Sequence, residues 1–140
     1  MTNPCPYAAY LCLFTVLLYG RVIGQLVVAV CAPGWLPPMA QWQSGLLPYP
    51  WLLAGQSVVL ILMSWITIDF AIGGFWIDPH PQLGRATVLW SDLYFGAMVA
   101  RYAVRMRLKP DQRWFGGTIP IVFHSMVAAF QWTFGIYHTR

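Results

Sequence analysis

Residues 50–72 read PWLLAGQSVVLILMSWITIDFAI, and this stretch decides the class of the fold. It carries no charge before Asp69, and its first residue, Pro50, suits the first turn of a helix because no hydrogen bond is lost there. Gly73 and Gly74 follow it and favour a helix end. A helix over 50–72 would be about 35 Å long, enough to cross roughly 30 Å of hydrocarbon. We therefore predict a membrane-spanning helix here.

Three further apolar stretches have spanning length, so the sequence predicts four transmembrane helices, over about 7–31, 50–72, 86–106 and 118–137. The third is expected to begin after Gly84-Arg85 and to stop before Lys109-Pro110. Because the connections are short, neighbouring helices should be antiparallel. The predicted fold is an all-α integral membrane protein, a compact antiparallel bundle of four transmembrane helices in one domain.

The composition indicates that lipid is the solvent. Of the 140 residues, 59% are hydrophobic and 9% are charged, which is more apolar surface than one small globule can bury. The net charge of +4 suits contact with anionic headgroups, and no nucleic-acid-binding motif accompanies it, so nucleic acid is not an expected partner. The N-terminal segment lacks the basic start of a secretory signal, and we expect it to be retained.

Basic side chains divide unequally between the two predicted sides of the membrane. Four flank the third connection and two lie on the other side: Arg105, Arg107, Lys109 and Arg113 against Arg85 and Arg140. Because short cytoplasmic loops are enriched in basic residues, we predict that both termini lie outside the cytoplasm. The strings WQSGLLPY (42–49) and IPIVFH (119–124) resemble those of small four-helix bacterial membrane proteins without assigned activity. Nothing about function is carried over from this resemblance, and the expected location is a bacterial inner membrane.

Polar side chains inside the predicted spans form the candidate site. A charge near the bilayer centre costs on the order of 2.5–3.5 kcal/mol, so each needs a partner, water or a ligand. Helical spacing pairs six of them on shared faces: Arg21 with Gln25, Tyr94 with Arg101, and His124 with Gln131. Together they predict an interior pocket for a ligand with a polar or anionic head, such as a quinone, lipid or pigment. The competing interpretation is that these groups bond to one another and fix helix register.

His124 is the strongest candidate for a cofactor ligand, because imidazole is the usual axial ligand of haem. A bis-histidine haem within the chain is not expected, since His138 lies about 21 Å farther along the same helix and His80 belongs to a connection at that end. A haem or pigment held by His124 alone stays open. The composition of Asp78-Pro79-His80-Pro81 is typical of a turn, and we predict no metal site there.

Recognisable catalytic patterns are missing from the sequence. All four acidic residues are dispersed aspartates, and no nucleophile elbow, P-loop, zinc or dinucleotide motif occurs, so enzymatic activity is not expected. The favoured interpretation is a small accessory or assembly subunit of a larger membrane complex, respiratory or photosynthetic, in contact with the bilayer and other integral subunits. The alternative is an independent redox or ligand-binding membrane protein that holds a quinone, lipid, haem or pigment through His124 and the Arg21 and Arg101 faces.

The predicted orientation places Cys5 outside the cell and Cys31 near the cytoplasmic face. In variants that keep one of these cysteines, a membrane-impermeant thiol reagent added to intact cells should label Cys5 and spare Cys31. Permeabilised cells, in which both should react, give the control. Labelling of Cys31 alone from the outside would reverse the orientation.

Overall fold

The computed structural model describes residues 3–42, 47–108 and 118–140, and all regular structure in these ranges is helical. The elements are, in chain order, α1 (Cys5–Cys31), α2 (Met39–Trp42), α3 (Tyr49–Ile72), the 3-10 helix η1 (Phe75–Ile77), α4 (Pro81–Leu108) and α5 (Thr118–His138). No strand occurs in these described ranges. The predicted all-α fold is confirmed.

Three helices, α1, α3 and α5, are long and apolar enough to cross a membrane. The longest helix, α4, has 28 residues but is more polar than the others, because it carries Arg85, Asp92, Arg101, Arg105 and Arg107. Three of the four predicted spans therefore coincide with helices that could cross a membrane. The fourth span, and with it the four-helix membrane bundle, stays a prediction.

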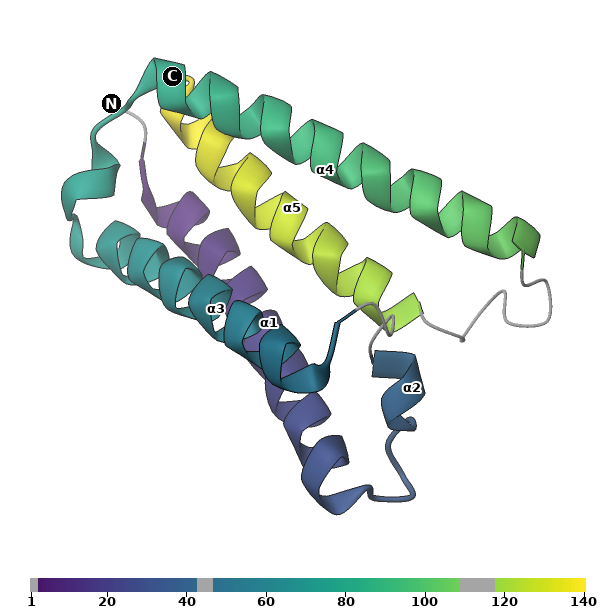
Figure 1. Ribbon diagram of the computed structural model, residues 1–140. Coiled ribbons are helices and arrows are strands. Elements are labelled where there is room, and N and C mark those ends of the chain that lie inside the picture. The colour runs from purple at the N-terminus through teal and green to yellow at the C-terminus, as the bar shows by residue number, and fades with distance from the viewer. Residues whose placement is uncertain (1–2, 43–46, 109–117) are drawn as a thin grey trace.

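The long helices form an open row (Figure 1). In this row α1 packs against α3 on one side and against α5 on the other, while the backbone of α4 neighbours only α5 among the described helices. The α1–α3 arm and the α4–α5 arm diverge towards α2, which contacts α1 and α5. The arrangement is more open than the compact bundle expected from short connections, because the outer helices α3 and α4 do not meet.

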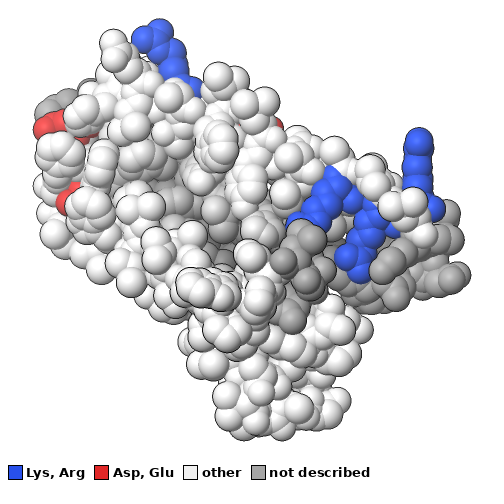
Figure 2. Space-filling model, viewed as in Figure 1, with Lys and Arg blue, Asp and Glu red and all other residues white. Residues whose placement is uncertain are grey.

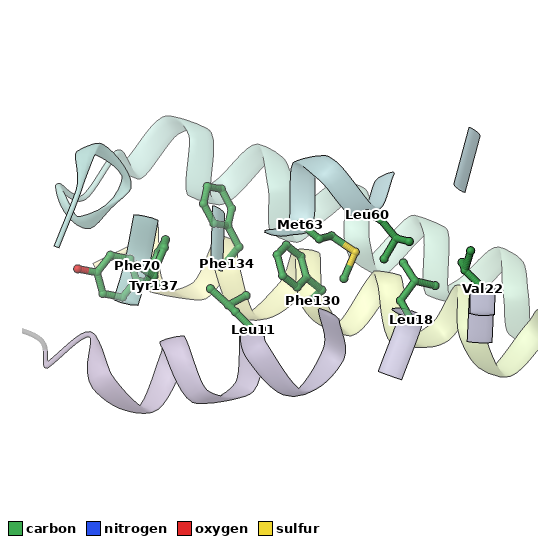
Figure 3. Close-up of a cluster of buried hydrophobic side chains, with 9 residues drawn as sticks. All are labelled: Leu11, Leu18, Val22, Leu60, Met63, Phe70, Phe130, Phe134 and Tyr137. Atoms are coloured by element: carbon green, nitrogen blue, oxygen red, sulfur yellow. The ribbon is translucent and has the colours of Figure 1, made fainter. Parts of the chain in front are cut away.

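The hydrophobic core lies between α1, α3 and α5 (Figure 3). Each helix contributes three buried side chains: Leu11, Leu18 and Val22 from α1, Leu60, Met63 and Phe70 from α3, and Phe130, Phe134 and Tyr137 from α5. At the end that holds the chain termini, the ring of Phe70 lies 4.9 Å from that of Tyr137 and 5.9 Å from that of Phe134. Such aromatic pairs contribute about 0.5–1.5 kcal/mol each beyond burial. This closely packed end of the row is called the closed end below. The opposite end, where the two arms diverge, is called the open end.

The turn between α3 and α4 is held by Asp69. The helix α3 ends at Gly73, whose φ of 79° is left-handed and costs a glycine little, as the sequence predicts. The Asp69 carboxylate then accepts the backbone N–H of Trp76 at 2.7 Å, which caps η1. The hydroxyl of Tyr137 donates to the carbonyl of Ile77 at 2.6 Å and ties η1 to α5. The closed end is therefore fixed by polar contacts as well as by aromatic packing.

Two glycines let α4 and α5 cross at close range. A Cβ on Gly84 would lie 2.6 Å from the backbone carbonyl carbon of His138, and one on Gly135 would lie 2.9 Å from the backbone nitrogen of Val88. Neither backbone can move aside cheaply, so no larger residue fits at either position without separating the helices. Small residues at such crossings are typical of membrane helix pairs.

This crossing changes one predicted boundary. With Gly84 taken as a helix break, the third span starts at residue 86, but α4 begins at Pro81 and includes Gly84 as a contact. The small residue Gly135 on α5 thus admits a close neighbour. The hydroxyl of Ser91 donates to the carbonyl of Ala128 at 2.6 Å, within the same helix pair.

We predict that Gly84→Ala lowers the thermal unfolding midpoint in mild detergent, with a cost of about 1–3 kcal/mol typical of overpacking. Gly96→Ala is the matched control on the same helix, because a Cβ there meets no atom within 4 Å. It should leave the midpoint unchanged or raise it slightly, since alanine favours helix. Circular dichroism at 222 nm during heating measures both. Equal midpoints for the two variants would contradict the close crossing.

Candidate functional site

A cavity of about 410 Å³ lies at the open end, between the α1–α3 arm and the α4–α5 arm. Its walls are largely apolar and come from all five α-helices. Of the six side chains predicted from the sequence, four line it: Arg21, Tyr94, Arg101 and His124. The structure therefore brings residues from three of the predicted spans to one place.

Arg21 is buried in α1, 6% exposed, and neutral groups hold its guanidinium. Nη1 donates to Oε1 of Gln25 at 2.7 Å, and Nη2 donates to the backbone carbonyl of Trp42 at 2.8 Å. The amide of Gln56 donates to the same Gln25 oxygen at 3.3 Å. The predicted shared face of Arg21 and Gln25 is confirmed. Among the described residues no carboxylate pairs with this guanidinium, so its charge meets no opposite charge.

Trp42 brings α2 into the site. Its ring lies over Gly24, where an added Cβ would come within 2.8 Å of it, and its indole Nε1 donates to the carbonyl of Pro37 at 2.9 Å. The buried ring and the bond from Arg21 to the Trp42 carbonyl fold this connection back onto α1 and α5. The open end of the row is covered there by one helical turn.

On the other arm, the hydroxyl of Tyr94 and Nδ1 of His124 are hydrogen-bonded, with their rings edge-to-face at 5.8 Å between centroids. Arg101 lies two turns along α4 on the same face as Tyr94 and is within electrostatic range of both rings. No described residue forms a hydrogen bond or ion pair with Arg101. Two guanidinium groups from opposite arms thus line one cavity, and no described carboxylate lines it with them.

The other two predicted residues do not line the cavity. Gln25 is fully buried behind Arg21, where it holds the guanidinium. Gln131 lies two turns beyond His124 on α5, and its Oε1 is buried with no hydrogen-bond partner among the described residues. Some of the predicted polar groups therefore bond to one another, as the competing interpretation expects, and others face the cavity, where a ligand stays a prediction.

The remaining histidines lie at the opposite end, as the helical spacing predicts. His138 is fully buried, and its Nδ1 accepts the backbone N–H of His80 at 3.3 Å. Nδ1 of His80 lies 2.6 Å from the carbonyl of Asp78. Within the described ranges, no three histidine, cysteine or acidic side chains come together as metal ligands. This end is best described as a packed aromatic and histidine cluster.

Sequence reasoning missed three residues that shape the cavity: Trp42, Trp51 and Gln56. Gln56 gave a usable signal, because a polar amide is uncommon within an apolar predicted span such as 50–72. The two tryptophans gave none, since the chain has eight and interfacial tryptophans are common in membrane proteins.

A scan against protein-family models and searches of curated proteins and of solved structures return no match. The residues of the cavity are therefore the basis for a functional proposal. The apolar cavity is surrounded by two guanidinium groups, a phenol–imidazole pair and an amide. Groups of these kinds can bind and orient a ligand.

We predict different effects for substitutions of the two arginines on the thermal stability of the ligand-free protein. Arg21→Met should lower the thermal midpoint, because it leaves the Trp42 carbonyl without its donor and removes a bond to Gln25, a loss of about 1–3 kcal/mol. Arg101→Met should leave the midpoint unchanged or raise it, because it removes a charge that no described residue pairs with. Tryptophan fluorescence during heating in neutral detergent distinguishes them. A larger loss from Arg101→Met than from Arg21→Met would contradict this account.

Proposed function

We propose that this chain is a four-helix integral membrane protein that binds an amphiphilic ligand with an anionic head in the cavity between its two arms. One observation carries the proposal: Arg21 and Arg101 line the same largely apolar cavity, and no described carboxylate lines it with them. Charge without a partner is expensive where the dielectric is low. A carboxylate or phosphate between the two guanidinium groups removes that cost, and the apolar walls accept its chain.

The packing of α4 along α5 supports a fourth span. The two helices contact from Gly84 beside His138 to Tyr94 beside His124, so α4 shares the depth of a helix that is apolar enough to cross. In Figure 2 most of the basic side chains in view lie towards one end of the molecule, whereas a further basic side chain lies at the opposite end, where acidic side chains are also seen. Arg105 and Arg107 lie in the last turns of α4, where long basic side chains reach the headgroups. This end is proposed to face the cytoplasm.

The charge of the site favours an anion over the other ligands considered. A neutral quinone would leave both guanidinium charges uncompensated. A haem iron would have to use Nε2 of His124, because Tyr94 already engages Nδ1. A carboxylate or phosphate head instead matches the donors of Arg21 and Arg101 directly.

A second candidate is the accessory or assembly subunit of a larger membrane complex. The observation that favours it is the exposed surface of α4, which has one backbone neighbour among the described helices and presents large apolar side chains: Leu83, Leu89, Trp90, Leu93, Phe95 and Val99. The two proposals are compatible, because a subunit that holds a ligand can also bind a larger respiratory or photosynthetic assembly.

The ligand proposal is tested with the purified chain in neutral detergent, titrated with oleate and with dioleoyl phosphatidic acid while thermal stability or bound mass is followed. Both anions should bind, and Arg101→Met should weaken binding at least tenfold, which is about 1.4 kcal/mol. Arg107→Met, on an exposed residue outside the cavity, is the matched control and should bind normally.

Uncharged probes complete this test. Oleyl alcohol and decyl-ubiquinone should bind much more weakly than oleate, and Arg101→Met should not change their binding. If the alcohol or the quinone binds as tightly as the anions, the anionic head is wrong. A preference for phosphatidic acid over oleate would identify a phosphate head, and the reverse would identify a carboxylate.

A further inference from the structure

Asp92 lies on α4 at the depth of the middle of α5. The adjacent Ser91 donates its hydroxyl to the carbonyl of Ala128 at 2.6 Å, and Ala128 is central in the apolar span Ile119–His138. The side chain of Asp92 is nevertheless exposed, and no described residue hydrogen-bonds or forms an ion pair with it. Arg85, seven residues earlier on the same face, is about 10 Å away along the helix and too far for a direct pair.

The surface beside Asp92 has the form of a helix-binding face. Asp92, Gly96, Val99 and Ala103 recur at spacings of four, three and four and are all exposed. A Cβ on Gly96 would meet no atom within 4 Å, so this glycine is not used in the packing of the chain itself. Gly96 and Ala100 have the small-x-x-x-small spacing that lets a second membrane helix approach closely. This contrasts with Gly84, whose contact with α5 is already made.

We propose that this face, defined by Asp92, Gly96, Val99, Ala100 and Ala103, binds a membrane-spanning helix of a different protein that presents a lysine or arginine at the depth of Asp92. The charge of the Asp92 carboxylate would be complementary to that of the lysine or arginine. A carboxylate facing hydrocarbon is costly unless a cation pairs with it, and the lipid chains at this depth offer none. The inference deepens the accessory-subunit proposal and rests on α4 crossing the membrane, but it does not depend on the cavity ligand.

A second copy of the chain fits this face poorly. Two copies related by a two-fold axis along the membrane normal have the same residue at the same depth, so Asp92 would meet Asp92 and repel it. The nearest basic residue towards the other end of α4, Arg101, is nine residues and about 13 Å away along the helix. It also lies on the opposite side of α4, where it lines the cavity. The occupant is therefore expected to be another protein.

The first test uses a synthetic transmembrane peptide of leucine and alanine with one central lysine, and a twin with leucine in its place. Energy transfer between the labelled chain and each peptide in phosphatidylcholine vesicles measures binding. The lysine peptide should bind about fivefold more tightly or better, the gain typical of a polar contact between membrane helices. Asp92→Asn should abolish this preference. Asp78→Asn, an exposed carboxylate outside the face, should retain it.

Two variants keep the outcome interpretable. Gly96→Leu should weaken lysine-peptide binding with no loss of thermal stability, because the space it fills is empty in the chain alone. Arg101→Met, which should impair the cavity, should leave the peptide preference unchanged, so failure of either proposal is visible without the other. Equal binding of the two peptides, or a preference that survives Asp92→Asn, would overturn the inference.

A second test identifies the occupant in membranes of the native host. A photoreactive phenylalanine at Val99 should crosslink to a spanning helix of another protein, with a mapped lysine or arginine about three turns or fewer from the crosslink. Asp92→Asn should remove this adduct. A crosslink to a second copy of this chain, or adducts with lipid alone, would show that the face has a different occupant and would sink the proposal.

Discussion

The backbones of α4 and α5 touch where Gly84 meets Gly135, and α4 has no other backbone neighbour among the described helices. In the proposed membrane arrangement, lipid gives α4 and α5 no hydrophobic reason to associate, so their contact depends on close packing and on bonds such as that from Ser91 to the Ala128 carbonyl. The position of every other group on α4 follows from this contact. It turns Tyr94 towards His124 and leaves Asp92 on the outside.

The two ends of the row differ in how closely their helices pack. At the closed end, Phe70 and Tyr137 pack edge-to-face and Asp69 caps η1, so apolar and polar contacts support each other. At the open end, Arg21 uses its hydrogen bonds to hold Trp42 and Gln25, and the arms stay apart. A rigid closed end can keep the open end in place without filling it. Proteins commonly tolerate such poorly compensated regions where they bind ligands, at some cost in stability.

The sequence predicted the helices better than their lateral order. Long apolar runs such as 50–72 identify candidate spans by length, and the spacing of four places Arg21 beside Gln25, because both follow from helix geometry alone. Which helices touch could not be predicted, since residues that face lipid and residues that face the core are both apolar. Gln131 illustrates a second limit: its spacing from His124 gives the shared face correctly, but it is about 10 Å farther along the axis, beyond the cavity.

The charges of α4 point in opposite directions, and this arrangement supports the proposal that the chain acts with a ligand and a partner. Nine residues separate Asp92 from Arg101, which places them about 180° apart at 100° per residue, so they cannot neutralise each other. A chain that functioned by itself in lipid would gain by pairing these charges or replacing them with leucine. In the proposed membrane arrangement, this chain keeps a cation facing its cavity and an anion facing outwards at mid-span depth. On that proposal each charge takes its own counter-charge, one from a ligand within the cavity and one from a neighbouring helix.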